Sequence, residues 1–92
     1  MANVTALSLL KTALGVTHDK RDDYYKSLLA ASERELSGRG VAIDESEIDD
    51  IMLLVDYAEF NYRNRDGAKI IPQHIDLRIK NRKAKGRSER GD

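Results

Sequence analysis

Apolar residues recur at three- and four-residue steps along most of this chain, which is the spacing of one face of an α-helix. Four segments carry the pattern, and glycines or polar turns separate them. They are marked by Leu7, Leu10, Ala13 and Leu14; by Tyr25, Leu28, Leu29, Ser32 and Leu36; by Ile48, Ile51, Met52, Val55, Ala58 and Tyr62; and by Ile75 and Ile79. We find no convincing strand, and only Gly40 to Ile43 is a candidate for a short extended piece. The pattern predicts an all-α fold, a small bundle of three to four helices.

Residues that favour helix ends lie between these segments. Gly15 is suited to the left-handed position that ends a helix, and Gly38 and Gly40 break the second segment. For the beginnings, we expect N-caps at Thr5, at Thr17 or Asp19, and at Asp44 with Glu47 reaching back, and Pro72 at the first position of the fourth helix.

The third segment is apolar around much of its circumference, which is typical of a helix at the centre of a bundle or in a subunit interface. Tyr57 falls off its main stripe, and Tyr24 stands beside the stripe residue Tyr25, so we expect both rings to be at least partly exposed. Exposed tyrosines are enriched at protein interfaces, although two ordinary surface rings explain them equally well. The residues that we expect to pack against other subunits or partners are Ile51, Val55, Tyr57, Tyr62 and Tyr24.

The 92 residues suffice for one domain with a small core, because about a quarter of them are Leu, Ile, Val or Phe. A domain this short buries a modest share of its surface, so contacts with partner subunits would add to its stability. The chain has no cysteine, which excludes disulfides and thiolate chemistry. It shows neither an apolar run of the roughly 20 residues that span a bilayer nor a basic-then-apolar leader, so we expect a soluble, unexported protein with no membrane partner.

The net charge of zero conceals a division between an acidic body and a basic end. Residues 1–62 hold 6 basic and 12 acidic side chains, whereas residues 78–92 hold 7 basic and 2 acidic ones. Such asymmetry indicates oriented contact with a charged partner, and a solvated tail that aids solubility is the alternative. We divide the chain into a helical domain at 1–83 and a basic tail at 84–92, which we expect to be disordered and flexible unless a partner orders it.

The basic end forms two adjoining cationic strips along the expected fourth helix. They could follow the phosphates of a nucleic acid, or lie against an acidic patch that includes the body of a neighbouring copy. The absence of aromatic residues after Tyr62 argues against stacking on unpaired bases, and the thin apolar anchor argues against a base-reading recognition helix. The residues that we expect to face a partner or DNA are Arg78, Lys80, Arg82, Lys83, Lys85 and Arg87.

Groups that could carry chemistry are few. His18 and His74 have no second ligand at zinc-site spacing, and we expect surface or capping roles for both. The acidic run lacks the loop pattern of a calcium site and is explained by the dipole of a helix that begins there. Its members are Asp44, Glu45, Glu47, Asp49 and Asp50. We therefore expect no enzyme activity, metal or cofactor.

Two stretches of the second half, 56–67 and 72–82, look like the corresponding part of the small head–tail connector proteins (head completion or adaptor proteins) of tailed bacteriophages. The opening stretches 9–16 and 18–24 resemble the first helix of that family and the acidic start of its second. The resemblance covers roughly residues 5–83, and it depends on the order and spacing of the stretches.

The resemblance implies a helical subunit that assembles as a ring, usually of twelve copies in the virion, beneath the portal protein. Such a ring extends the DNA channel, lets DNA pass without sequence specificity, and docks a tail-side connector or stopper protein. It implies a virion neck location after synthesis in the host cytoplasm, and it transfers no catalytic residue. The alternative is a small helical nucleic-acid-binding or regulatory protein that uses its basic C-terminal segment.

Overall fold

The computed structural model describes residues 2–64 and 70–89, with side chains described for 5–64 and 70–84. Over these residues the protein is all-α, as predicted. It contains α1 (Ala2–Leu14), α2 (Asp22–Gly38), α3 (Ile48–Arg63) and α4 (Gln73–Glu89), and the described residues contain no strand. The body is a small, flat bundle with principal extents of 46 × 32 × 18 Å.

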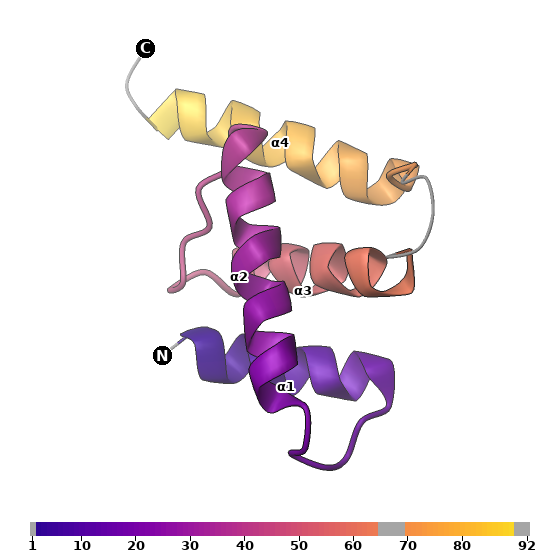
Figure 1. Cartoon of the computed structure of the whole chain (residues 1–92). Coiled ribbons are helices and arrows are strands. Elements are labelled where there is room, and N and C mark those ends of the chain that lie inside the picture. The colour runs from indigo at the N-terminus through magenta and orange to yellow at the C-terminus, as the bar shows by residue number, and fades with distance from the viewer. Residues whose placement is uncertain (1, 65–69, 90–92) are drawn as a thin grey trace.

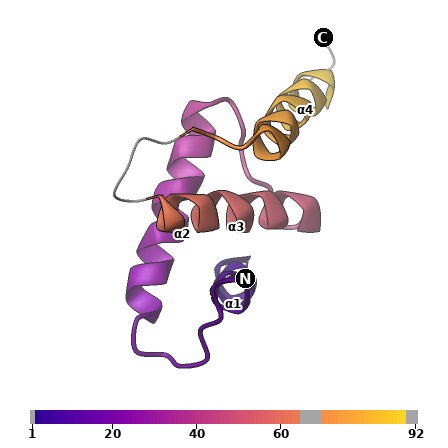
Figure 2. The same ribbon diagram turned by 90° about the vertical axis from the view of Figure 1, so that its right-hand side faces the viewer.

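The four helices form two layers. In Figure 1, α1, α3 and α4 lie one above another while α2 crosses them, and Figure 2 shows α2 to one side of α1 and α4. The middle helix, α3, packs against each of the other three. The C-terminal ends of α1 and α3 lie together, where Arg63 donates a hydrogen bond to the carbonyl of Ala13 (3.5 Å), so these two helices run the same way. In contrast, α4 runs back along α3 in the opposite direction.

The central position of α3 explains its composition. Of its sixteen residues, nine are buried: Asp50, Ile51, Leu53, Leu54, Val55, Tyr57, Ala58, Phe60 and Asn61. They meet buried residues of every other helix, among them Leu10 of α1, Leu36 of α2 and Ile79 of α4. The sequence left two explanations for the apolar character of this helix, a place at the centre of the bundle or a subunit interface. The structure supports the first.

One polar contact lies inside this core. Ser32 of α2 and Asn61 of α3 are both buried, and the Asn61 amide donates a hydrogen bond to the Ser32 hydroxyl at 3.1 Å. Buried polar groups left without partners cost free energy, so this bond favours the one alignment of α2 on α3 in which the two side chains meet.

The helix beginnings differ from those expected. The first helix starts at Ala2, three residues before Thr5, and α2 has Arg21 as its N-cap in place of Thr17 or Asp19. Glu47 is the N-cap of α3 and makes no capping side-chain bond. Asp44 instead accepts hydrogen bonds from the amide and hydroxyl of Ser46, because an aspartate can close a local turn with its own neighbours as readily as it caps a helix.

The last helix also differs in extent. Pro72 directly precedes α4, and its carbonyl accepts the amides of Ile75 and Asp76. The helix then continues to Glu89, past the expected boundary at residue 83. The rest of the predicted tail, residues 90–92, lies outside the described residues.

Among the residues that the structure describes, two glycines adopt the left-handed backbone conformation, Gly15 at φ 74°, as predicted, and Gly40 at φ 95°. At Gly40 a Cβ atom would also lie 3.0 Å from Cε of Lys83 on α4. We expect Gly40→Ala to lower the free energy of unfolding by about 1–2 kcal/mol, because an L-residue is strained there. Urea unfolding measures the loss.

The matched control for this substitution is Gly38→Ala. Gly38 is the last residue of α2, and a Cβ there meets nothing within 4 Å. Since alanine favours helix over glycine, this variant should be neutral or more stable by up to about 1 kcal/mol. Equal losses at the two positions would contradict the assigned role of Gly40.

Candidate interaction surface

The attachment of α4 to the bundle depends on few apolar contacts. Ile75 and Ile79, one turn apart, are its only described apolar side chains that are buried, each about 3% exposed. The sequence placed both on the packed face, and the structure confirms this. The remaining contacts of α4 with the bundle are largely polar, and they use residues that we expected to face a partner.

Arg82 makes the most buried of these polar contacts. Its Nε donates to both carboxylate oxygens of Asp50 on α3 (2.9 and 3.1 Å), and Nη2 donates to the carbonyl of Ala42 at 3.0 Å. The Asp50 side chain is 6% exposed and also accepts the amide of Asp44 at 2.8 Å. This group, which we call the Asp50 clasp, ties α4 to α3 and to the loop between α2 and α3.

Three other cations of α4 have contacts within the chain. Arg78 forms an ion pair with Asp56 of α3, and each of the two side chains is about one-third exposed. The aliphatic stem of Lys83 lies against Gly40. Lys80 pairs with Asp76 one turn away at 3.0 Å and is 67% exposed.

Because of these contacts, fewer cations of the basic strips are available to a partner than the sequence suggested. Of the six cations that we assigned to a partner or to DNA, Arg78 and Arg82 pair with acidic residues of α3, and Lys80 pairs with Asp76 of its own helix. Part of the opposite charge of the acidic body and the basic end is therefore neutralised within one copy. Lys80 remains on the surface. The side chains of Lys85 and Arg87 lie outside the described residues.

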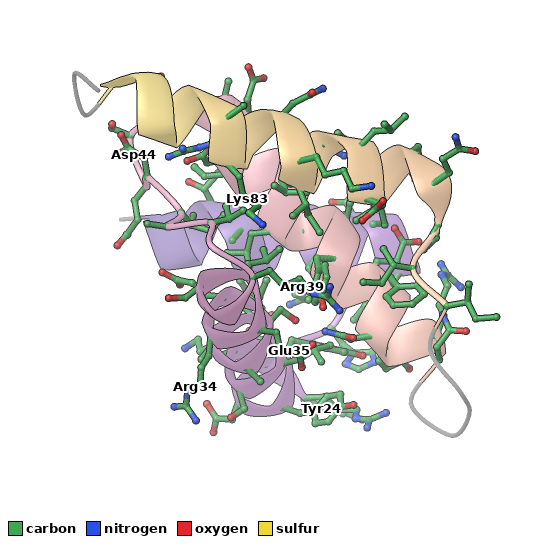
Figure 3. All side chains as sticks on the ribbon, turned by 90° about the horizontal axis from the view of Figure 1, so that it is seen from above. Tyr24, Arg34, Glu35, Arg39, Asp44 and Lys83 are labelled. Carbon is green, nitrogen blue, oxygen red and sulfur yellow. The ribbon has the colours of Figure 1, made fainter. Side chains whose placement is uncertain are left out.

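Tyr57 is buried, and the expectation that it is exposed was wrong. Its ring is 2% exposed and lies between α2 and α3. The hydroxyl donates to Glu35 (3.0 Å) and accepts from Nε of Arg39 (3.2 Å). Figure 3 shows Glu35, on α2, and Arg39, which directly follows α2, on the side toward α3. Burial, together with the bond to Glu35, raises the pKa of Tyr57 above 10.0, with Arg39 opposing.

Of the other four residues expected at a partner interface, two are buried and two reach the surface. Ile51 and Val55 are 6% and 2% exposed within the subunit, so they offer no surface to a second copy. Tyr24, by contrast, is 38% exposed, as expected, and Tyr62 is half-buried. The two rings pack edge to face, with the Arg21 guanidinium 4.9 Å from the Tyr24 ring centre. Of the five predicted contact residues, only these two tyrosines reach the surface.

Large apolar side chains are also exposed at four positions outside the five predicted contact residues. They are Ile48 (58%), Met52 (39%), Ile70 (85%) and Leu77 (49%). Ile48 and Met52 are one turn apart on α3. The sequence did indicate this exposure, because a helix that is apolar around its circumference leaves apolar side chains on the surface unless other elements enclose it on every side.

The acidic residues of the run at 44–50 and the two histidines do not come together at one site in the described part of the chain. Four members of the run are exposed, and the fifth, Asp50, belongs to the clasp. His18 and His74 are exposed and come from different elements. In the described part of the chain, no three histidine, aspartate or glutamate side chains are grouped so that they could hold a metal ion. An open groove of about 280 Å³ lies beside the clasp, between α3 and α4.

A second charged contact closes the loop between α1 and α2. Lys11 of α1 lies 2.8 Å from Asp22 and 2.9 Å from Asp19. The hydrogen bonds that Lys11 donates to Asp22 and, second, to Asp19 raise the pKa of Lys11 above 10.5, and the same bond to Asp19 lowers the pKa of Asp19 below 3.8.

We therefore expect Lys11→Met to return the pKa of Asp19 toward 3.8, as measured by NMR titration of the carboxyl carbons. The lowered pKa of Asp19 gives stability that is present above pH 3.8 and lost as pH falls through the folded value. The raised pKa of Lys11 gives stability that is present below pH 10.5 and lost as pH rises through the folded value. Lys20→Met, which removes another cation of the same loop, is the control. An unchanged Asp19 titration in Lys11→Met would contradict the assignment.

None of the helices over the described ranges combines the length and the apolar character that crossing a membrane requires. Comparison with known proteins identified no relative: no family model, no curated protein and no solved structure matches the chain.

Proposed function

We propose that this protein is a structural head–tail connector subunit of a tailed bacteriophage or prophage. Copies of it assemble as a ring, of twelve in the virion, below the portal protein, where the ring extends the DNA channel and docks a tail-side connector or stopper protein. It is made in the host cytoplasm, ends in the virion neck, and acts by assembly without catalysing a reaction.

The resemblance of residues 56–67 and 72–82, in order and spacing, carries the proposal. These stretches form the second half of α3, the exit from it, and the first half of α4. Two features of the fold support an assembly role. The bundle is small and flat, and four of its large apolar side chains on α3, α4 and the segment before α4 are between 39% and 85% exposed. Exposed apolar surface of this kind favours contact with other protein.

The alternative, a nucleic-acid-binding protein that uses the basic end, is less well supported. Arg78 and Arg82 would have to leave carboxylates of their own subunit to reach phosphates. We therefore expect weak binding to duplex DNA with a shallow dependence on salt, measured by fluorescence anisotropy. A steep loss of affinity between low and moderate salt, in protein that forms no ring, would favour the alternative.

Electron microscopy of negatively stained protein, combined with size-exclusion chromatography and light scattering, tests the proposal. We expect closed rings when the purified protein is mixed with its cognate portal protein, because a bound first layer raises the local concentration of subunits. The portal alone and the protein alone are the controls. Failure to bind the portal, or particles that join heads to tails normally without this protein, would refute the proposal.

A further inference from the structure

Three of the exposed apolar side chains define two surfaces that differ in the charged groups beside them. The first, which we call the α3 patch, consists of Ile48 and Met52, 58% and 39% exposed, with Glu45 and Asp49 exposed beside them. The two apolar residues are one helical turn apart, so they form a continuous surface. The surface is apolar with an acidic edge.

The second surface is the outer side of α4, which we call the α4 ridge. Leu77 lies between Ile75 and Ile79 in sequence but on the opposite side of the helix, which leaves it 49% exposed while the two isoleucines are buried. Lys80 is one turn further along, with 67% of its side chain exposed. Its pairing with Asp76 is an exposed i,i+4 contact, and such contacts are weak and readily exchanged for others.

The charges decide how two copies could meet. If the α3 patch met its own symmetry mate, two acidic edges would face each other, and juxtaposed like charges oppose association. The α4 ridge offers the complementary combination, an apolar residue beside a cation. The two surfaces belong to different helices, so a contact between them joins two different parts of the subunit, as a head-to-tail contact and a closed ring require.

We infer that the α3 patch of one copy binds the α4 ridge of the next, with Leu77 packed against Ile48 and Met52, and Lys80 beside Asp49. The inference rests on the proposed function, because it supplies the contact that repeats around the ring. The surfaces are small, so the contact is weak between free subunits and becomes effective when a portal gathers them.

Cysteine pairs test this contact directly, because the chain has no cysteine of its own. In the double variant Met52→Cys/Leu77→Cys, oxidation during assembly on the portal should link successive copies and give a ladder of oligomers on a non-reducing gel. Each single variant should give dimers at most. The matched control is Met52→Cys/Ile70→Cys, since Ile70 is 85% exposed and belongs to neither surface. A ladder of equal yield in this control, or none in the first variant, would overturn the inference.

Mixing blocked variants gives a second test that does not depend on disulfides. Met52→Glu disables the α3 patch and Leu77→Glu disables the α4 ridge, and both sites are exposed enough for the fold to persist, which circular dichroism checks. Each variant alone should assemble at least about tenfold less than wild type, as expected when an interface anchor is lost. An equimolar mixture should stop at one-to-one complexes, because only one patch and one ridge remain intact in each pair.

The outcomes separate this inference from the proposed function. Wild-type rings on the portal together with normal rings of both glutamate variants would overturn the inference and leave the connector role standing. One-to-one complexes in the mixture without any portal binding by the wild type would overturn the connector role and support the contact. Ile48→Glu, at 58% exposure, replaces Met52→Glu if the latter unfolds.

Discussion

Replacing Arg82 with alanine is expected to lower the free energy of unfolding by about 3 kcal/mol, because it leaves a buried carboxylate without its cation. Asp50 is 4% exposed and would keep only the amide hydrogen bond from Asp44. The carbonyl of Ala42 would lose its donor as well. Urea unfolding followed by circular dichroism measures the change.

The same helix offers a control for this prediction. Arg78 and Asp56 form an ion pair of the same type, but about a third of each side chain is exposed to water. Arg78→Ala should therefore cost about 1 kcal/mol or less, as exposed pairs do. If the two alanine variants lost equal stability, burial would not be what distinguishes the two pairs, and the clasp would have no special role.

Ile79→Ala should cost about 2–4 kcal/mol, since it removes one of the two apolar side chains that attach α4 and leaves a cavity beside α3. In a domain whose total stability is of the order of 5–15 kcal/mol, that loss is substantial. Hydrogen exchange should show amide protection lost first in α4, while α1 and α3 stay protected.

Leu77→Ala is the matched control, because Leu77 is two residues away on the exposed side of the same helix. It should change the free energy of unfolding by no more than about 0.5 kcal/mol. A uniform loss of protection along the whole chain in Ile79→Ala would show instead that α4 unfolds only together with the rest of the bundle.

Helix number and most of the core follow from the periodicity of the sequence, because each helix buries the residues that recur at three- and four-residue steps. Tyr57 shows where that reasoning fails. A single stripe assumes that a helix packs on one side, but α3 has neighbours on three sides, so a residue off the main stripe is also buried. How many neighbours a helix has is a property of the tertiary fold.

The Asp50 clasp could not be predicted for a related reason. Asp50 and Arg82 are 32 positions apart, and five acidic residues near a helix beginning are adequately explained by the helix dipole. Asp50 of that run meets Arg82 because α4 lies antiparallel along α3. The same course explains why Arg78 and Arg82, which were expected to face a partner, contact their own subunit.

The parallel course of α1 and α3 has a consequence for how fast this chain reaches its native state. Helices that are neighbours in sequence can pair early, but α1 meets α3 only after the 33 residues between Leu14 and Ile48 have closed into a loop. Closing that loop costs entropy before its contacts form, so the rate-limiting step should require α1 and α3 together. Substitutions at Leu10 should therefore slow refolding, whereas substitutions at Ile79 should mainly accelerate unfolding.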